Sequence, residues 1–182
     1  AIAMCIYSDE NVDYVVMETG LGGKLDATNA IAHPVLSVIT TISLEHTAIL
    51  GDTLEKIATE KAGIIKKGVP VVFLAKKDET TAVFINKAKE AGTVYTAVMP
   101  KDYKIRENKA NYIDFLVNNE YYKNDCFVID SKAIYQVENC TLALTAAAVM
   151  QRYNIAHIDI QCSRKAVREA HWEGRMEEVL PD

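Results

Sequence analysis

Continuous apolar runs at four places along the chain alternate with stretches of helical periodicity. The runs occupy residues 12–17, 35–42, 69–75 and 94–97. They are short and rich in β-branched side chains, which is typical of strands covered on both faces within a parallel sheet. We therefore predict four strands, the second of which is opened by Pro34.

Helices are predicted between and after these runs. Asp52 and Glu55 have the spacing of a capping box, so we predict a helix that starts beside them, runs to about residue 67 and is ended by Gly68. Its apolar stripe is formed by Leu54, Ile57, Ala58 and Ile65. The other predicted helices are an opening one that ends at Tyr7, one over residues 79–91 capped by Asp78 and ended by Gly92, one over residues 137–153, and one capped by Ser163 that runs to about residue 170.

From residue 100 to about residue 136 the pattern changes to an alternation of apolar and polar residues. The alternating stretches, separated by Asn and Asp, are residues 103–105, 112–117, 120–123 and 126–129. Such a pattern predicts a small antiparallel meander. We therefore predict an α/β fold, a mostly parallel sheet flanked by helices, with an antiparallel β insert at about residues 100–136. Residues 171–175 are predicted as a loop and residues 176–180 as the start of a strand.

Composition narrows the class of protein. A chain of 182 residues can bury a real core, and one domain is the default expectation. The net charge of −5 and the pI near 5.4 argue against general affinity for nucleic acid or for an anionic membrane. No apolar run is long enough to span a membrane, and no secretory signal is visible. We expect a cytoplasmic protein.

The cysteines and the two ends of the chain add to this picture. The four cysteines lie far apart without a CxxC pair, which predicts free thiols in a reducing cytoplasm. The chain begins at Ala1 without an initiator methionine, and it stops just after a new apolar pattern has begun. We interpret it as an excised piece of a longer protein.

Two candidate metal ligands follow the first two predicted strands. Glu18 comes directly after residues 12–17, and His46 lies just beyond residues 35–42. In open α/β sheets, ligands bind outside the carboxyl ends of the strands, so both side chains could face one crevice. A carboxylate and an imidazole, completed by nucleotide phosphates and water, suit Mg²⁺ or Mn²⁺. Taken singly, each residue is better explained as structural, Glu18 as a cap of the next turn and His46 as a hydrogen-bonded loop residue.

Lys61 falls on the apolar stripe of the helix that starts beside Asp52. An ammonium group on a buried stripe is costly unless it is paired. A neutral lysine amine can react with CO₂ to form a carbamate, an anion that could hold a second metal. The alternatives are a side chain that extends to solvent, or an ion pair with Glu18 or Glu60. Spacing alone favours these alternatives.

A glycine-rich turn follows Glu18, with glycines at positions 20, 22 and 23. Glycines can leave backbone N–H groups free to converge on an anion, but a plain tight turn explains them equally well. The string GLGGK matches neither the dinucleotide-binding nor the phosphate-loop pattern, and no Walker-type phosphate loop occurs in the sequence.

Four strings, taken in order, resemble the folylpolyglutamate synthase/dihydrofolate synthase family of the Mur ligase superfamily. They are ETGLGGKLDATN, SLEHTAILGDTLEKIATEKAGIIK, YQVENCTLAL and WEGR. The match runs through nearly the whole chain, is most specific over residues 18–66 and is weak across the meander. The resemblance implies that residues 1–175 are a central, P-loop NTPase-like ATPase domain without its phosphate loop. Residues 176–182 would start the connection to a C-terminal domain.

The resemblance implies an ATP-dependent amide ligase. A carboxylate of folate or dihydropteroate takes the γ-phosphoryl group of ATP and becomes an acyl phosphate. The amine of L-glutamate then attacks, giving an amide, ADP and phosphate. Metal ions would neutralise phosphate charge. We expect the isolated piece to be inactive and prone to self-association, because its apolar surface would be exposed, and the complete protein to be a monomer.

The resemblance also implies roles for individual residues. Glu18 and His46 match magnesium ligands, and Lys61 matches a carbamylated lysine, which reverses the preference from spacing. Asn139 matches an asparagine near the adenine, and Arg175 an arginine that reaches the nucleotide. The loop expected to face substrate or phosphate contains Gly22, Gly23, Asp26 and Asn29.

Three positions depart from the family pattern. Glu45 replaces Asp, Glu173 replaces Pro, and Lys24 replaces Arg. Two other functions remain open. One is a Mur- or cyanophycin-type ligase that acts on a different carboxylate, and the other is a non-catalytic module that binds a nucleotide or a partner.

Overall fold

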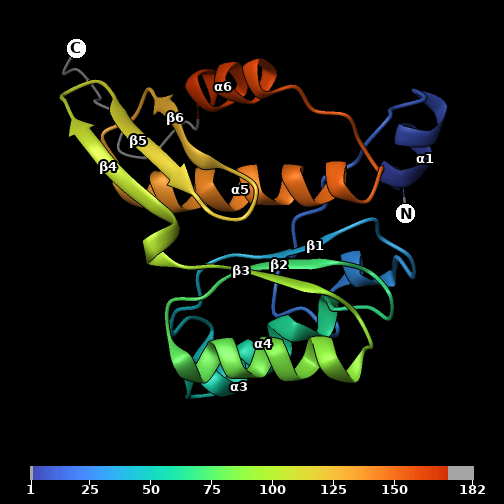
Figure 1. The fold of residues 1–182 in the computed structure, drawn as a ribbon. Helices are drawn as coiled ribbons and strands as arrows, with labels where there is room; N and C mark the ends of the chain where they lie inside the picture. Colours follow the sequence, from blue (N-terminus) through green and yellow to red (C-terminus); the bar gives the residue numbers. More distant parts are fainter. Residues whose placement is uncertain (1, 172–182) are drawn as a thin grey trace, which may run out of the picture.

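The computed structural model describes residues 2–171, and its centre is a parallel sheet with helices on both faces (Figure 1). The sheet contains β1 (Ser37–Ile39), β2 (Val71–Leu74) and β3 (Tyr95–Val98) in the order β1-β2-β3. The middle strand, β2, is buried along its whole length because it has a neighbour on each edge and helices above and below. The predicted α/β class is confirmed.

Alternate residues of β2 contribute to two different cores, as strand geometry requires. Phe73 packs with Phe84, their ring centroids 5.2 Å apart, on the face covered by α3 (Leu54–Lys61) and α4 (Asp78–Glu90). Val72 packs on the opposite face, which α5 (Tyr135–Arg152) covers.

The predicted meander is present as a second, antiparallel sheet. Its strands are β4 (Tyr103–Asn108), β5 (Ile113–Asn118) and β6 (Lys123–Ile129), paired in the order β4-β5-β6. The stretch predicted as a strand at residues 120–123 is instead mostly turn. The side chain of Asn119 folds this turn by accepting hydrogen bonds from the backbone N–H groups of Tyr121 and Tyr122.

The long helix α5 lies between the two sheets and is buried by both (Figure 1). Val137 and Leu144 join the core formed with the antiparallel sheet and α6 (Ile160–Glu169). Leu142 and Val149 join the core formed with β2 and β3. A helix covered on two sides is expected to lack a single apolar stripe, and this explains the even spread of alanine and leucine along its sequence.

The remaining elements are short. They are the helices α1 (Ile2–Asp9) and α2 (Thr47–Leu50) and the 3₁₀ helices η1 (Ala27–Ala30), η2 (Ala62–Ile64) and η3 (Pro100–Asp102). No helix among residues 2–171 is both long and apolar enough to cross a membrane.

The prediction of a strand at residues 12–17 is wrong. The segment forms no helix or strand, and the side chain of Val16 is 96% exposed. A strand needs a neighbour that satisfies its backbone groups, and within the described residues β1 pairs with β2 alone. The Tyr14 hydroxyl connects the segment to the residues that follow α5, because it donates to the carbonyl oxygen of Ile155 at 2.7 Å.

The second predicted strand and the first capped helix are shorter than expected. β1 keeps only the middle of the run predicted over residues 35–42. α3 ends at Lys61 and continues as η2, so the helix does not reach residue 67. Gly68 and Gly92, the two glycines predicted to end helices, have positive φ values of 71° and 59°.

The predicted helix caps are also corrected. α3 is capped by Thr53, whose hydroxyl accepts from the amide of Lys56, whereas Asp52 forms an ion pair with the Lys56 ammonium group at 2.7 Å. Asp78 is the first residue of α4 rather than its cap. α6 is capped by Asp159, so that Ser163 lies inside this helix. Residues 172–182, including the predicted strand start and the boundary at residue 175, lie outside the described part of the chain.

Candidate active site

The carboxyl ends of β1, β2 and β3 lie at one edge of the parallel sheet, where α/β proteins place their ligands. Glu45 and His46 are in the loop that follows β1, and Lys76 follows β2. The ammonium group of Lys76 lies 2.7 Å from a carboxylate oxygen of Glu138, which places the first turns of α5, and with them Asn139, beside the end of β2.

The glycine-rich loop is folded around the carboxylate of Asp26. This carboxylate accepts hydrogen bonds from the amides of Gly20, Leu21 and Thr28 and from the Thr28 hydroxyl, at 2.6–3.0 Å. The Thr28 hydroxyl, followed by these amides, lowers the pKa of Asp26 to about 2. The amides of Gly20 and Leu21 are therefore bonded to a carboxylate of the same loop rather than left free for an external anion.

Glycines allow this loop to pack directly against the end of α3. The amide of Lys24 donates to the carbonyl oxygen of Glu60 at 3.0 Å. A Cβ on Gly23 would lie 2.6 Å from that same oxygen, and a Cβ on Gly63 would lie 2.5 Å from the Cα of Lys24. These distances are too short for any side chain, so the strings GLGGK and EKAGIIK form one structural unit. Gly22, also buried, has a positive φ of 68°.

Asn29 links the two parts of this unit. Its side-chain amide donates to the carbonyl oxygens of Lys24 and Gly63, and its own carbonyl oxygen accepts from the ammonium group of Lys66 at 3.0 Å. The structure therefore gives Asn29 bracing contacts, and it gives Asp26 a loop-folding role. Neither observation tests the predicted contact with substrate or phosphate.

Lys61 lies at the end of α3 and is paired with a carboxylate. Its ammonium nitrogen is 3.1 Å from an oxygen of Glu45, and its side chain is 24% exposed. The sequence suggested Glu18 or Glu60 as the partner, and the structure shows Glu45 instead. The pair joins the end of α3 to the loop after β1, one residue before His46.

Both candidate metal ligands, Glu18 and His46, are exposed. His46 precedes α2 in a left-handed conformation with φ of 51°, and its imidazole makes no cap hydrogen bond to that helix. A non-glycine residue at positive φ is uncommon and is enriched at functional sites.

Magnesium binding by Glu18 and His46 stays a prediction. Residues 2–171 contain no group of three or more His, Cys, Asp or Glu side chains arranged to hold a metal ion. Mg²⁺ is usually bound by one or two carboxylates together with substrate phosphates and water, rather than by an all-protein cage. A site with two protein ligands, Glu18 and His46, is compatible with that chemistry.

Asn139 is exposed on α5, and its side-chain amide donates to the side-chain oxygen of Gln136 at 2.9 Å. Arg175 lies outside the described residues. Sequence reasoning missed Glu138 and Lys76. An acidic residue in the first turn of a helix, and a lysine just past a strand, are the signals that could have identified them.

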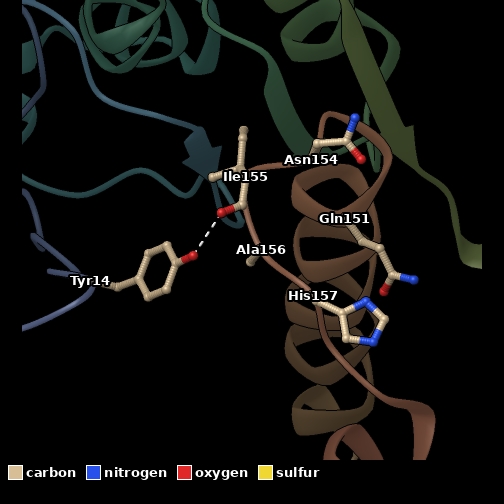
Figure 2. A pocket seen from close by; sticks show the side chains of 6 residues that line it. All are labelled: Tyr14, Gln151, Asn154, Ile155, Ala156 and His157. Carbon is tan, nitrogen blue, oxygen red and sulfur yellow. Dashed lines mark hydrogen bonds between the residues drawn. The ribbon is translucent and has the colours of Figure 1, made fainter.

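Two hollows in the described surface lie near the other end of α5 and contain none of the predicted site residues. One, of about 480 Å³, is lined by Tyr14, Gln151, Asn154, Ile155, Ala156 and His157 (Figure 2). The other, of about 820 Å³, lies among the turn before β6, the end of α5 and the start of α6. Throughout residues 2–171, no buried side-chain nitrogen or oxygen lacks a hydrogen-bond partner.

Known proteins identify the family of this chain. The Mur ligase middle domain matches residues 3–150. A dihydrofolate synthase/folylpolyglutamate synthase of Bacillus subtilis is 35% identical over 173 residues, which cover 92% of this chain and 39% of that protein.

Solved structures show the same relationship. A complex of folylpolyglutamate synthase (FPGS) with AMPPCP superimposes with a TM-score of 0.89 at 29% identity, covering 99% of this chain and 45% of the other. An FPGS–AMPPCP–folate complex gives a TM-score of 0.85 at 28% identity, covering 98% of this chain and 44% of the other. The chain thus spans less than half the length of these relatives. Because the family match extends over most of its residues, this chain belongs to the Mur ligase middle-domain family, in which the relatives described above are folylpolyglutamate and dihydrofolate synthases.

Proposed function

We propose that this chain is the central part of an ATP-dependent ligase that adds L-glutamate to folate or dihydropteroate. The observation that carries the proposal is the similarity of nearly the whole chain to the FPGS–AMPPCP–folate complex, with a TM-score of 0.85. AMPPCP is an ATP analogue, so this relative holds counterparts of two of the three substrates of the proposed reaction, ATP and the pteridine acceptor.

The proposed reaction has two steps. A carboxylate oxygen of the pteridine substrate attacks the γ-phosphorus of ATP, so that an acyl phosphate forms and ADP leaves. The neutral amine of glutamate then attacks the acyl carbon, phosphate leaves, and the amine gives up a proton. The products are an amide, ADP and phosphate.

The residues of the candidate site have distinct roles in this proposal. Glu18 and His46 would hold Mg²⁺, with Mn²⁺ as an alternative, and the ion would neutralise charge on the phosphates. Asn139 would orient the nucleotide base, and Arg175 would contact the nucleotide. The unit formed by the glycine-rich loop and the end of α3 would hold its backbone in one position beside the substrate.

Lys61 has a specific requirement in this proposal. As an ammonium group it is attracted to Glu45, at 3.1 Å. A carbamate would place a negative charge beside that carboxylate, so carbamylation requires Glu45 to turn away or a cation to lie between the two groups. We propose that the Lys61–Glu45 pair is the state without CO₂, and that carbamylation breaks it.

The deciding experiment measures ADP release by the complete parent protein with ATP, Mg²⁺ and L-glutamate. The acceptor is dihydropteroate, tetrahydrofolate or a muramyl peptide. Lys61→Ala is compared with Lys67→Ala, a control at an exposed lysine in the same region. We expect turnover only with a pteridine acceptor, and we expect it to be largely lost in Lys61→Ala but not in the control.

Each other outcome has a defined meaning. Release of ADP only with the muramyl acceptor, or none with any acceptor, would reject folate ligation. Full turnover in Lys61→Ala would support the proposed ligase activity but show that Lys61 has only a structural role. The isolated 182 residues, assayed in parallel, should release no ADP, and size-exclusion chromatography would test the expected self-association of the piece and the monomeric state of the parent.

A further inference from the structure

Glu138 joins three segments at the carboxyl edge of the parallel sheet. One of its carboxylate oxygens accepts from the ammonium group of Lys76, just past β2, at 2.7 Å. The other oxygen accepts from the hydroxyl of Tyr103, the first residue of β4, at 2.9 Å. Glu138 itself lies in the first turn of α5. One carboxylate therefore fixes the start of this helix against two strands.

The surroundings of Glu138 favour a fixed geometry. Its side chain is only 16% exposed, and both of its oxygens are used. Burial, followed by the hydrogen bond to Glu138, raises the pKa of Tyr103 to about 12, so the tyrosine remains a hydrogen-bond donor. A charged group that is little exposed is costly to leave unpaired, and this keeps the three side chains together.

The start of α5 has no side-chain cap. Ile134, at the N-cap position, has no side chain that accepts a hydrogen bond. Asn139, the next residue after Glu138, is exposed and contacts only the neighbouring Gln136 among the hydrogen bonds described. Its position relative to the sheet edge therefore depends on how the first turns of α5 are held.

We infer that Glu138 is a positioning residue for the nucleotide site, because its bonds to Lys76 and Tyr103 hold Asn139 at the carboxyl edge of the sheet. The inference rests on the proposed contact of Asn139 with the nucleotide. The inference does not depend on which acceptor substrate receives the glutamate.

The test measures the affinity of the complete parent protein for Mg-ADP by calorimetry, together with its melting temperature without nucleotide. Glu138→Ala removes both bonds, and we expect a roughly tenfold weaker affinity, because binding must then also order the start of α5. Glu138→Gln keeps an acceptor for Tyr103 and should lie between Glu138→Ala and the unchanged protein.

A double variant with exchanged charges distinguishes a positioning role of Glu138 from a general loss of stability. Lys76→Glu and Glu138→Lys should each weaken binding of Mg-ADP, and the double variant, which restores an ion pair, should recover most of the loss. The matched control is Glu90→Gln, which breaks the exposed pair between Lys87 and Glu90 on α4 and should leave the affinity unchanged.

Three results would overturn the inference. They are an unchanged affinity in Glu138→Ala, an affinity loss in the single variants that the double variant does not recover, and no binding of Mg-ADP by the unchanged protein. Because the readout is nucleotide binding, it is independent of the folate assay. A protein whose affinity for Mg-ADP depends on Glu138 but that never ligates a pteridine would reject the proposed function and keep this inference.

Discussion

At the scale of single residues, Asp26 shows how one carboxylate can organise a loop. It accepts four hydrogen bonds from residues close to it in the chain, and its pKa falls from 3.8 to about 2. A lowered pKa in the folded state means that the ionised form is stabilised by folding. Its contribution to stability is complete above the unfolded pKa and is lost as the pH falls toward the folded pKa.

The first prediction concerns the acid range of stability. The unfolding free energy of Asp26→Asn should be lower than that of the unchanged protein by a constant amount above pH 5 or so. This difference should shrink as the pH falls from about 4 to about 2, the interval between the two pKa values. Urea unfolding at a series of pH values measures it. Parallel curves for the two proteins over that interval would contradict the assignment.

The second prediction concerns the close contact between the glycine-rich loop and the residues after α3. In Gly63→Ala the new methyl group would lie 2.5 Å from the Cα of Lys24, so backbone must move. We expect a loss of about 1–3 kcal/mol of stability, as for other overpacked sites. Gly20→Ala is the control, because its nearest atom would be at an ordinary 3.5 Å. Equal losses in the two variants would show that helix or turn propensity, rather than this contact, sets the cost.

At the scale of secondary-structure elements, the third prediction tests the corrected cap of α3. Thr53→Ala should lower stability by about 1 kcal/mol, because the amide of Lys56 loses its acceptor. Asp52→Ala breaks only an exposed ion pair and should have a smaller effect. Thermal unfolding of both variants gives the order. A larger loss in Asp52→Ala would restore the capping box predicted from the sequence.

The pattern of apolar residues correctly predicted the strands and helices that are packed on more than one side. The run that contains β2 and the long helix α5 were both correctly predicted, because their apolar residues meet packed surfaces. Residues 12–17 have the same pattern but form no strand, since patterning reports a tendency toward burial and cannot supply a hydrogen-bonding partner. The predicted cap of α3 was wrong because Asp52 and Thr53 are both good caps, and only backbone geometry selects between them.

The candidate site was less predictable than the fold. The sequence suggests partners for Lys61 that are close to it along the same helix, such as Glu60. The partner in the structure is Glu45, which lies in the loop after β1. The bonds between Glu138 and its partners Lys76 and Tyr103 likewise join segments that are far apart in the sequence. Patterning alone gives no information on such contacts, because they depend on how the sheet edges meet.

At the scale of the whole molecule, α5 is the element that the two cores share. The fourth prediction is that Leu142→Ala, which alters the core at the parallel sheet, and Leu144→Ala, which alters the core at the antiparallel sheet, each lower stability by about 2–5 kcal/mol. Each should also reduce hydrogen-exchange protection in both sheets, because loosening α5 uncovers both. Loss of protection confined to the nearer sheet in either variant would show that the two cores unfold independently.

The place of α5 in the chain also matters during synthesis. The six strands found in residues 2–171 all precede α5 in the sequence, so the ribosome completes both sheets before the helix that covers them emerges. Until then two apolar surfaces have no cover, namely the side of β2 that faces α5 and the inner face of β5. A nascent chain in that state exposes apolar surface, which chaperones bind and which promotes aggregation. A ribosome that pauses only after α5 has left the exit tunnel, instead of before residue 135, would hold a chain in which both surfaces can already be closed.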